Sequence, residues 1–190
     1  MSGMAIISDS AKPAAKNFRI SEFYSKSANR PTEHYLPLIL ITAVQALRDH
    51  LGVPITVNSS YRTPEHQTLL RGLAGSKAAS VSGSPHCRAI EVNGKENKAL
   101  PVSYALDIAN SKQVQLIREI RERGKAYHIL RCLEITGIGI YDTFLHIDVR
   151  PPKFLTQGLT DEYGKLQFWD YQKKKPLPEQ NKRQAIHPSP

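Results

Sequence analysis

One short segment constrains the fold of this chain more than any other, because its apolar and polar residues alternate strictly. In Phe144-Leu-His-Ile-Asp-Val-Arg150, aliphatic residues separate His146, Asp148 and Arg150. Successive side chains of a β-strand point to opposite faces, so the three polar groups share one face of a half-buried strand. Burying them is costly unless their charges are used, which leaves two interpretations open: a functional site or a structural salt-bridge network.

Other segments predict a mixture of helices and strands. Residues 134–141 are expected to form a second strand, joined to the first as a hairpin around Asp142. Apolar residues at helical spacing, with glycine just beyond the end, predict two clear helices, and Pro64 after Thr63 begins a third. The expected helices lie within 33–51, 64–73 and 112–123, the further strands are 53–60 and 102–107, and the loops are 74–85 and 93–101.

Length and composition limit the domain organisation. The chain has 190 residues, of which 40% are hydrophobic, enough for one ordinary core. Residues 1–16 are small and polar and are expected to form a flexible N-terminal arm, followed by one folded domain over 17–152. Periodicity is lost after Pro152, so residues 153–190 are expected to form a partly disordered extension in which 167–171 add an edge hairpin.

The charge balance indicates an anionic partner. The 26 Lys and Arg against 17 Asp and Glu give a net charge of +9, which suits nucleic acid, a membrane surface or a bacterial wall. Nucleic acid is not expected, because the basic residues are scattered apart from Lys173–Lys175 and no recognised motif accompanies them. No transmembrane stretch and no Sec-type signal are visible. Cys87 and Cys132 are expected to be free thiols, with a single bridge as the alternative.

Three separated residues form a candidate metal site. They are His86, after a Ser/Gly/Pro-rich segment, Asp107, at the end of a strand-like run, and His146. Two imidazoles and one carboxylate leave a tetrahedral zinc with an open position for water, the arrangement of catalytic sites. The set therefore indicates a zinc hydrolase. Glu91, five residues beyond His86, is the alternative carboxylate ligand.

A fourth candidate, Arg62, lies at the corner between the strand 53–60 and the helix 64–73. There its guanidinium can face an anionic group or a developing oxyanion. The alternative is a turn arginine bonded to backbone carbonyls. His34 and His66 have no comparable context and are expected at the surface.

Together, three motifs resemble the zinc D-Ala-D-Ala carboxypeptidases, whose relatives include vancomycin-resistance D,D-dipeptidases, phage endolysin L,D-endopeptidases and the hedgehog signalling fold. Ser59-Ser-Tyr-Arg62 is similar to the family's Ser-Gly-Tyr-Arg. Residues 137–141 and 146–150 are similar to its Gly-x-Gly-x-Tyr strand and His-x-Asp-x-Arg. The resemblance covers about 17–152 and implies an α+β fold of the hedgehog/D,D-peptidase type, with a small antiparallel sheet flanked by helices.

The middle motif departs from the family pattern, which resembles Ser-x-His-x-x-Gly-x-Ala-x-Asp. Asp107 stands 21 positions after His86, where the family spacing is seven, so 14 residues are inserted between Cys87 and Ser103. Closure entropy grows slowly with loop length, so an insertion that loops out allows the two halves of the motif to meet. An ungapped alignment would place Asn93 at the ligand position, and its amide is a poorer zinc ligand than a carboxylate.

By the resemblance, the three candidate ligands hold one zinc ion and Arg62 stabilises the oxyanion. Some relatives place an acidic residue three positions before the last His, but Thr143 stands there in this chain. Asp148 is therefore expected to be the general base, with Asp142 as the alternative. Asp148 has a second candidate role, which is to orient His146.

The resemblance implies a metallopeptidase of cell wall degradation. Its substrate is a stem peptide of bacterial peptidoglycan, cleaved next to a D-amino acid with carboxypeptidase or endopeptidase specificity. The positive charge agrees with the anionic polymers of the wall. The expected enzyme is a monomer that acts at the wall or in the periplasm, as a phage endolysin or virion component made in the host cytoplasm. The competing hypothesis is a non-catalytic module of the same fold that binds wall or a protein partner.

Overall fold

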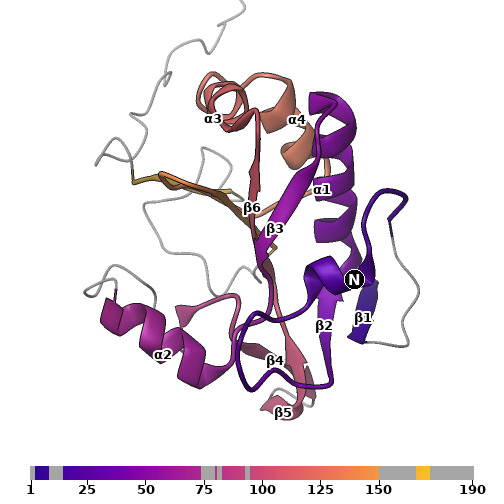
Figure 1. The fold of residues 1–190 in the computed structure, drawn as a ribbon, viewed down its shortest axis with the longest axis vertical. Coiled ribbons are helices and arrows are strands. Elements are labelled where there is room, and N and C mark those ends of the chain that lie inside the picture. Colours follow the sequence, from indigo (N-terminus) through magenta and orange to yellow (C-terminus); the bar gives the residue numbers. More distant parts are fainter. Residues whose placement is uncertain are drawn as a thin grey trace, which may run out of the picture.

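The computed structural model of the protein describes residues 3–8, 15–73, 80, 83–92, 95–149 and 166–171. Within these ranges the chain forms two sheets (Figure 1). The four-stranded sheet has the order β1 (Met4–Ser8), β2 (Glu33–Pro37), β5 (Lys95–Val102) and β4 (Arg88–Val92). The five-stranded sheet has the order β3 (Ile55–Ser59), β6 (Ala105–Asn110), β8 (Leu145–Asp148), β7 (Gly137–Ile140) and β9 (Gln167–Asp170).

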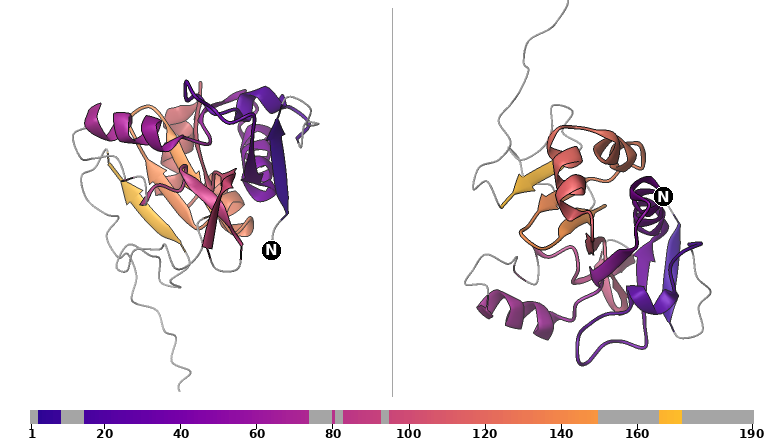
Figure 2. Two further views of the ribbon diagram at one scale, coloured as in Figure 1. Left: turned by 90° about the horizontal axis from the view of Figure 1, so that it is seen from below. Right: turned by 45° about the horizontal axis from the view of Figure 1, so that its top comes forward.

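Four α-helices complete the described fold: α1 (Leu38–Leu51), α2 (Pro64–Leu73), α3 (Gln113–Arg121) and α4 (Lys125–Cys132). A 3₁₀ turn, η1 (Ile20–Phe23), precedes β2. Helix α4 contacts both α1 and α3, and α1 contacts β6, so these three helices and the five-stranded sheet enclose the core. Helix α2 lies apart at the other end of the molecule (Figure 1, Figure 2). None of the described helices has the length and apolar character needed to span a bilayer.

The α+β class expected from the sequence is confirmed, but the sheet arrangement is more complex than the single small antiparallel sheet expected. Each sheet contains one parallel pair, β2 with β5 and β7 with β9. Strand β9 lies at the edge of its sheet, as expected for 167–171, but it pairs with β7 rather than forming a hairpin. Its neighbour β7 is distant in sequence, which is why local turn signals could not predict the pairing.

Helix α1 begins later than the start of its apolar periodicity. Residues 33–37 form β2, and Leu38 follows Pro37 as the first helical residue. The buried stripe of α1 then runs to Leu51, and Gly52 ends the helix with a φ of 65°. Leu36 belongs to the expected helical stripe but lies in β2. Its side chain is nevertheless fully buried in the core. The expected helix 64–73 is confirmed as α2.

The N-terminal segment differs from the flexible arm expected over 1–16. Met4–Ser8 forms strand β1 and pairs antiparallel with β2. Ile7 is buried in the core and Ala5 packs against it, so the alternating apolar side chains of this segment stabilise it in the sheet. The remaining parts of the expected arm, and most of the expected extension over 153–190, lie outside the described residues.

Helix α4 was not expected from the sequence. It is only eight residues long, and Ala126 and Leu130 provide its buried contacts. Glu119 of α3 joins it to the rest of the helical layer, because its carboxylate accepts hydrogen bonds from the Ala126 backbone N–H (3.0 Å) and from His50 Nε2 of α1 (2.7 Å). Gln115 donates a third at 3.0 Å.

These contacts predict a pH-dependent contribution to stability. Burial raises the pKa of Glu119, but its hydrogen bonds outweigh burial, and the pKa lies below its usual value. A lowered pKa stabilises the fold above the unfolded value of about 4.3 and ceases to do so as the pH falls through the folded value. Glu119→Gln should lose about 1.5 kcal/mol at pH 7 in urea unfolding. The difference from wild type should shrink below about pH 4. A difference independent of pH would contradict this account.

Candidate metal centre

The candidate site is one row of residues across the five-stranded sheet. Ser59 of β3 is opposite Asp107 of β6, and Asp107 is opposite His146 of β8. His146 is opposite Gly139 of β7, which is opposite Trp169 of β9. Directly opposed residues in neighbouring strands point to the same face, so all five positions share one face of the sheet.

His86 comes from outside the sheet and is held by backbone hydrogen bonds on both sides. The Arg62 N–H donates to the His86 carbonyl at 2.9 Å, and the Tyr104 N–H donates to the Pro85 carbonyl at 2.8 Å. The loop residue is therefore clamped between the end of β3 and the start of β6. Its side chain is 2% exposed.

The inserted segment forms a hairpin that restores the motif. Strands β4 and β5 pair antiparallel from Arg88 opposite Val102 outward. The residues before and after the hairpin are therefore adjacent, and His86 meets Asp107 despite their separation in sequence. Part of the segment expected as the loop 93–101 is thus strand β5, because its residues pair with both β4 and β2.

Three buried atoms that could each bind a metal ion converge at this point. His86 Nε2 lies 3.2 Å from Asp107 Oδ1 and 3.3 Å from His146 Nδ1. His146 Nδ1 lies 2.7 Å from the same Asp107 oxygen. Among the described residues, these three form the group whose ligand atoms lie close enough to one another to hold a metal ion. The structure thus brings together the three ligands predicted from the sequence.

The far nitrogen of each histidine has its own acceptor. His86 Nδ1 lies 2.6 Å from the Ser60 carbonyl, which can only accept, so this nitrogen carries the proton and Nε2 presents a lone pair. His146 Nε2 lies 3.0 Å from Asp148 Oδ2 and donates to that carboxylate. Acceptors behind the ligand histidines fix the ring orientation and the tautomer that a metal requires.

Arg62 lies beside the ligands, with its guanidinium fixed by three neighbours. Its Nη2 donates to Asp107 Oδ2 in a short ion pair. Its Nε donates to Ser59 Oγ at 2.8 Å and its Nη1 to Gln67 Oε1 at 3.3 Å. Side-chain acceptors from β3, α2 and β6 thus hold it toward the cluster, unlike the turn arginine bonded to backbone carbonyls.

Electrostatics favour a neutral His86 beside a charged Asp107. Burial, followed by the Arg62 charge, lowers the pKa of His86 to about 4. Burial acts to raise the pKa of Asp107, but the two histidines and Arg62 outweigh it and hold the pKa well below its usual range. For His146, burial acts to lower the pKa, yet the carboxylates of Asp107 and Asp148 raise it.

The arrangement therefore places an unprotonated nitrogen and a carboxylate oxygen in contact with no hydrogen between them. His86 Nε2 and Asp107 Oδ1 are both acceptors, and their approach is unfavourable unless a cation lies between them. A tetrahedral zinc with bonds of about 2.0–2.1 Å to nitrogen separates its nitrogen ligands by about 3.3 Å. The observed His86–His146 separation of 3.3 Å and His86–Asp107 separation of 3.2 Å are close to that value, whereas His146 Nδ1 and Asp107 Oδ1 lie at a hydrogen-bond distance of 2.7 Å.

Comparison with protein-family models decides the family. The model described as Peptidase M15 matches residues 16–148, which is most of the chain and contains the three converging residues and Arg62. The chain belongs to the Peptidase M15 family. No curated protein and no solved structure matches it.

Family membership makes this M15 chain a metallopeptidase, and M15 peptidases depend on zinc. The match confirms the family resemblance that the three sequence motifs indicated. The roles of the individual residues stay predictions. The family match ends at Asp148, so strand β9 lies beyond it.

The other residues considered from the sequence lie elsewhere. Glu91, the alternative ligand, is exposed on β4 and paired with Glu96 across the hairpin, away from the cluster. Asp142, the alternative base, is exposed in the turn between β7 and β8. Asn93 and Arg150 lie outside the described residues.

Asp148 lies behind His146 rather than beside the three converging ligand atoms. It is fully buried, and its Oδ2 contacts His146 on the ring nitrogen that faces away from Asp107. Thr136 Oγ1 lies 3.5 Å from its other oxygen. This geometry favours the second role considered for Asp148, the orientation of His146, over the role of general base.

One buried residue near the site was missed. His34 was expected at the surface, but it is 2% exposed, stacks on Tyr61 at 5.6 Å between ring centroids, and lies 3.3 Å from Ser60 Oγ through its Nε2. Burial lowers its pKa to about 4. His34 therefore supports the Ser60 backbone that orients His86. Its position in the alternating run of β2 was the available signal.

Gly137 makes room for the Asp148 carboxylate. A Cβ at Gly137 would lie 2.3–2.4 Å from the carboxylate atoms of Asp148, which are buried and paired with His146. Gly137→Ala should therefore displace Asp148, cost about 1–3 kcal/mol of unfolding free energy and weaken metal binding. Gly72→Ala on α2 is the matched control, because a Cβ there meets nothing within 4 Å. Equal unfolding midpoints and zinc affinities for the two variants would contradict this prediction.

Proposed function

We propose that this protein is a zinc-dependent peptidase that hydrolyses peptidoglycan stem peptides at a bond next to a D-amino acid. The observation that carries the proposal is the buried convergence of His86 Nε2, Asp107 Oδ1 and His146 Nδ1, with Arg62 beside it. A site built only for stability has no need of a fixed guanidinium at its edge. The membership of the M15 family supports the peptidase chemistry.

The residues fit a zinc ion of the catalytic kind. His86, Asp107 and His146 supply two nitrogens and one oxygen, which leaves one tetrahedral position for water or substrate. Zinc in such a site polarises a carbonyl and lowers the pKa of bound water toward neutrality. The acceptors behind the two rings, the Ser60 carbonyl and the Asp148 carboxylate, hold them in the required tautomers.

Arg62 acts on the substrate in this proposal. Its interactions with Ser59, Gln67 and Asp107 use three of its five N–H donors, which leaves two for an oxygen that develops charge during peptide hydrolysis. Since these partners fix the guanidinium before substrate arrives, little reorganisation is needed as the charge develops. The Asp107 carboxylate shared between Arg62 and the ligand set couples the two parts of the site.

The substrate class rests on the family resemblance and on charge. The net charge of +9 favours accumulation at anionic wall polymers, and it agrees with an enzyme of the wall or periplasm, such as a phage endolysin. The general base is proposed to come from a residue other than Asp148, with Asp142 as the candidate from the sequence.

Digestion of purified peptidoglycan tests the proposal. Walls of several chemotypes are incubated with the zinc-loaded chain, with the chain after chelation, and with the chelated chain after zinc is restored, and the released peptides are identified by mass spectrometry. We expect one bond to be cut, no cleavage after chelation, and recovery with zinc. Zinc binding without cleavage of any wall would favour the non-catalytic binding module.

A further inference from the structure

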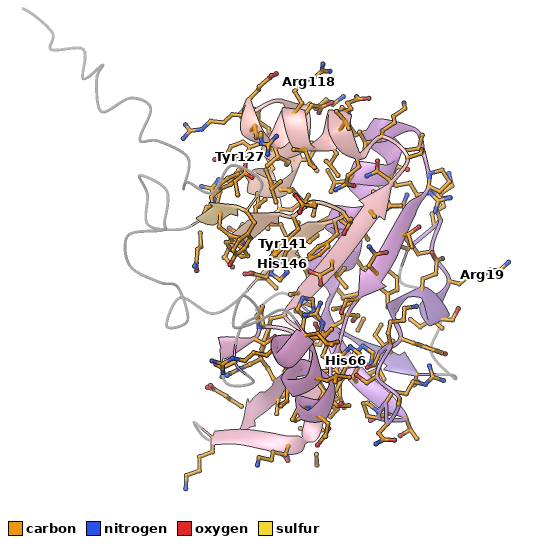
Figure 3. The ribbon with its side chains drawn as sticks, turned by 60° about the vertical axis from the view of Figure 1, so that its left-hand side comes forward. Arg19, His66, Arg118, Tyr127, Tyr141 and His146 are labelled. Atoms are coloured by element: carbon orange, nitrogen blue, oxygen red, sulfur yellow. The ribbon has the colours of Figure 1, made fainter. Side chains whose placement is uncertain are left out.

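A tryptophan from beyond the matched family segment packs against the His146 ring. The Trp169 ring of β9 lies 5.3 Å from the His146 ring, centroid to centroid, with 46° between the ring planes. This separation is typical of aromatic rings in contact. Figure 3 shows Tyr141, the hydrogen-bond partner of Trp169, on the same side of the molecule as His146. His146 therefore has an aromatic neighbour in addition to the carboxylates of Asp107 and Asp148.

The backbone makes room for this contact. Gly139 of β7 stands between Trp169 and His146 in the row across the sheet. A Cβ at Gly139 would lie 2.3 Å from Trp169 Nε1 and 2.4 Å from its Cε2, so a side chain there would push the indole away. The glycine therefore lets the indole lean across β7 and reach His146 on the far side of that strand.

A hydrogen bond fixes the indole in this position. Trp169 Nε1 donates to the Tyr141 hydroxyl at 3.2 Å. Tyr141 in turn stacks on Phe144 at 4.3 Å and contacts Tyr171 at 4.8 Å between ring centroids. A partly buried indole N–H needs an acceptor, and an acceptor inside a packed cluster leaves the indole little freedom to turn. Protein contacts alone, without a metal, thus set the orientation of the Trp169 ring.

Strand β9 is attached to the rest of the fold on both sides of Trp169. Before it, the Gln167 N–H donates to the Thr136 carbonyl at 2.7 Å. After it, Asp170 is buried and accepts from Arg121 Nε at 2.7 Å and Nη2 at 3.1 Å, which ties β9 to α3. A bidentate pair of this kind holds a specific geometry. The strand is therefore a fixed support for the indole.

The indole opposes a motion of His146 that its hydrogen bond allows. The bond from His146 Nε2 to Asp148 fixes the direction of the N–H, but the ring plane can still tilt about it. A tilt would turn the Nδ1 lone pair away from His86 and Asp107. Because metal affinity depends on the orientation of the ligand ring, a bulky neighbour that resists the tilt strengthens metal binding.

We propose that Trp169 is a positioning residue of the metal centre, whose indole holds the His146 ring in the orientation that zinc binding requires. Strand β9 then completes the site, although it lies beyond the family match and beyond the domain expected over 17–152 from the sequence. The inference rests on the proposed function, in which His146 is a zinc ligand. Trp169 acts through His146 and is assigned no contact with substrate.

The experiment compares full-length variants at a temperature where circular dichroism shows each of them to be folded. Competition with a chromophoric chelator gives the zinc affinity, and thermal unfolding gives the stability. The constants kcat and KM are measured on a stem peptide at saturating zinc. Phe168→Ala is the matched control, because Phe168 precedes Trp169 on β9, points to the opposite face and packs against the core.

Trp169→Ala should weaken zinc binding about 10-fold and lower kcat at saturating zinc by a similar factor. KM should stay within about 2-fold of wild type, because the indole does not touch substrate. Trp169→Phe keeps a ring beside His146 and should recover zinc affinity to within about 3-fold of wild type. Phe168→Ala should lower the melting temperature and leave zinc affinity within about 2-fold. Trp169→Leu and Phe168→Leu replace the alanine variants if these do not fold.

Three results would overturn the inference alone. One is a folded Trp169→Ala protein with the zinc affinity of wild type. Another is an equal loss of zinc affinity in Phe168→Ala, which would show that β9 acts only through general stability. The third is a raised KM with unchanged zinc affinity, which would place Trp169 against the substrate. A wild type that binds zinc but cleaves no peptide would instead defeat the proposed function, and zinc affinity would still decide the role of Trp169.

Discussion

Replacing His86 with alanine should lower zinc affinity by ~100-fold or more and abolish peptide cleavage. Loss of a partner behind a ligand typically costs 10–100-fold, and loss of a ligand itself costs at least as much. Unlike Asp107 and His146, which lie on paired strands, His86 comes from a loop just ahead of the inserted hairpin. Competition with a chromophoric chelator measures the affinity, and metal analysis of the purified protein measures the stoichiometry.

His66→Ala is the matched control for this variant. His66 lies partly buried on α2, outside the three converging residues. The same chemical change there should leave zinc stoichiometry and cleavage within about 2-fold of wild type. Circular dichroism establishes that both variants are folded. A folded His86→Ala protein that keeps one tightly bound zinc would remove His86 from the ligand set.

Replacing Arg62 with alanine should lower kcat by about 100- to 1,000-fold while zinc remains bound, because removal of one oxyanion donor typically has that effect. The ligand set stays complete, since both histidines still face Asp107. Arg62→Lys should recover only part of the rate, because an ammonium group cannot contact Ser59, Gln67 and Asp107 from a planar fork.

Arg71→Ala, on the exposed part of α2, controls for the loss of one positive charge. It should change KM on whole walls slightly and kcat on short peptides not at all. If Arg62→Ala loses zinc in parallel with activity, its ion pair with Asp107 supports the metal site, and the assignment to the oxyanion is wrong. If kcat is unchanged, Arg62 has no catalytic role.

The parts of the site predicted from the sequence are those whose signals are local. Strict alternation placed His146 and Asp148 on one face of β8, and their side chains contact each other at 3.0 Å. Helix α2 was predicted with its observed bounds, since Thr63-Pro64 marks its start. The insertion between Cys87 and Ser103 was expected to loop out, and the β4–β5 hairpin does so.

The parts that were missed depend on contacts between distant segments. Pairing with β7 places Trp169 beside His146, and no local pattern identifies a parallel partner so far along the chain. His34 contacts Ser60 and Tyr61, which follow β3 and lie far from His34 in sequence. Which side of His146 the Asp148 carboxylate occupies depends on the missing Cβ of Gly137. Side-chain roles of this kind depend on tertiary contacts.

Anomalous diffraction at the zinc absorption edge, from crystals of the full chain grown with zinc, tests the central claim most directly. The account predicts one strong peak per chain, about 2.0–2.2 Å from His86 Nε2, His146 Nδ1 and an oxygen of Asp107. No peak among these three residues, or a strong peak bound by other side chains, would contradict it.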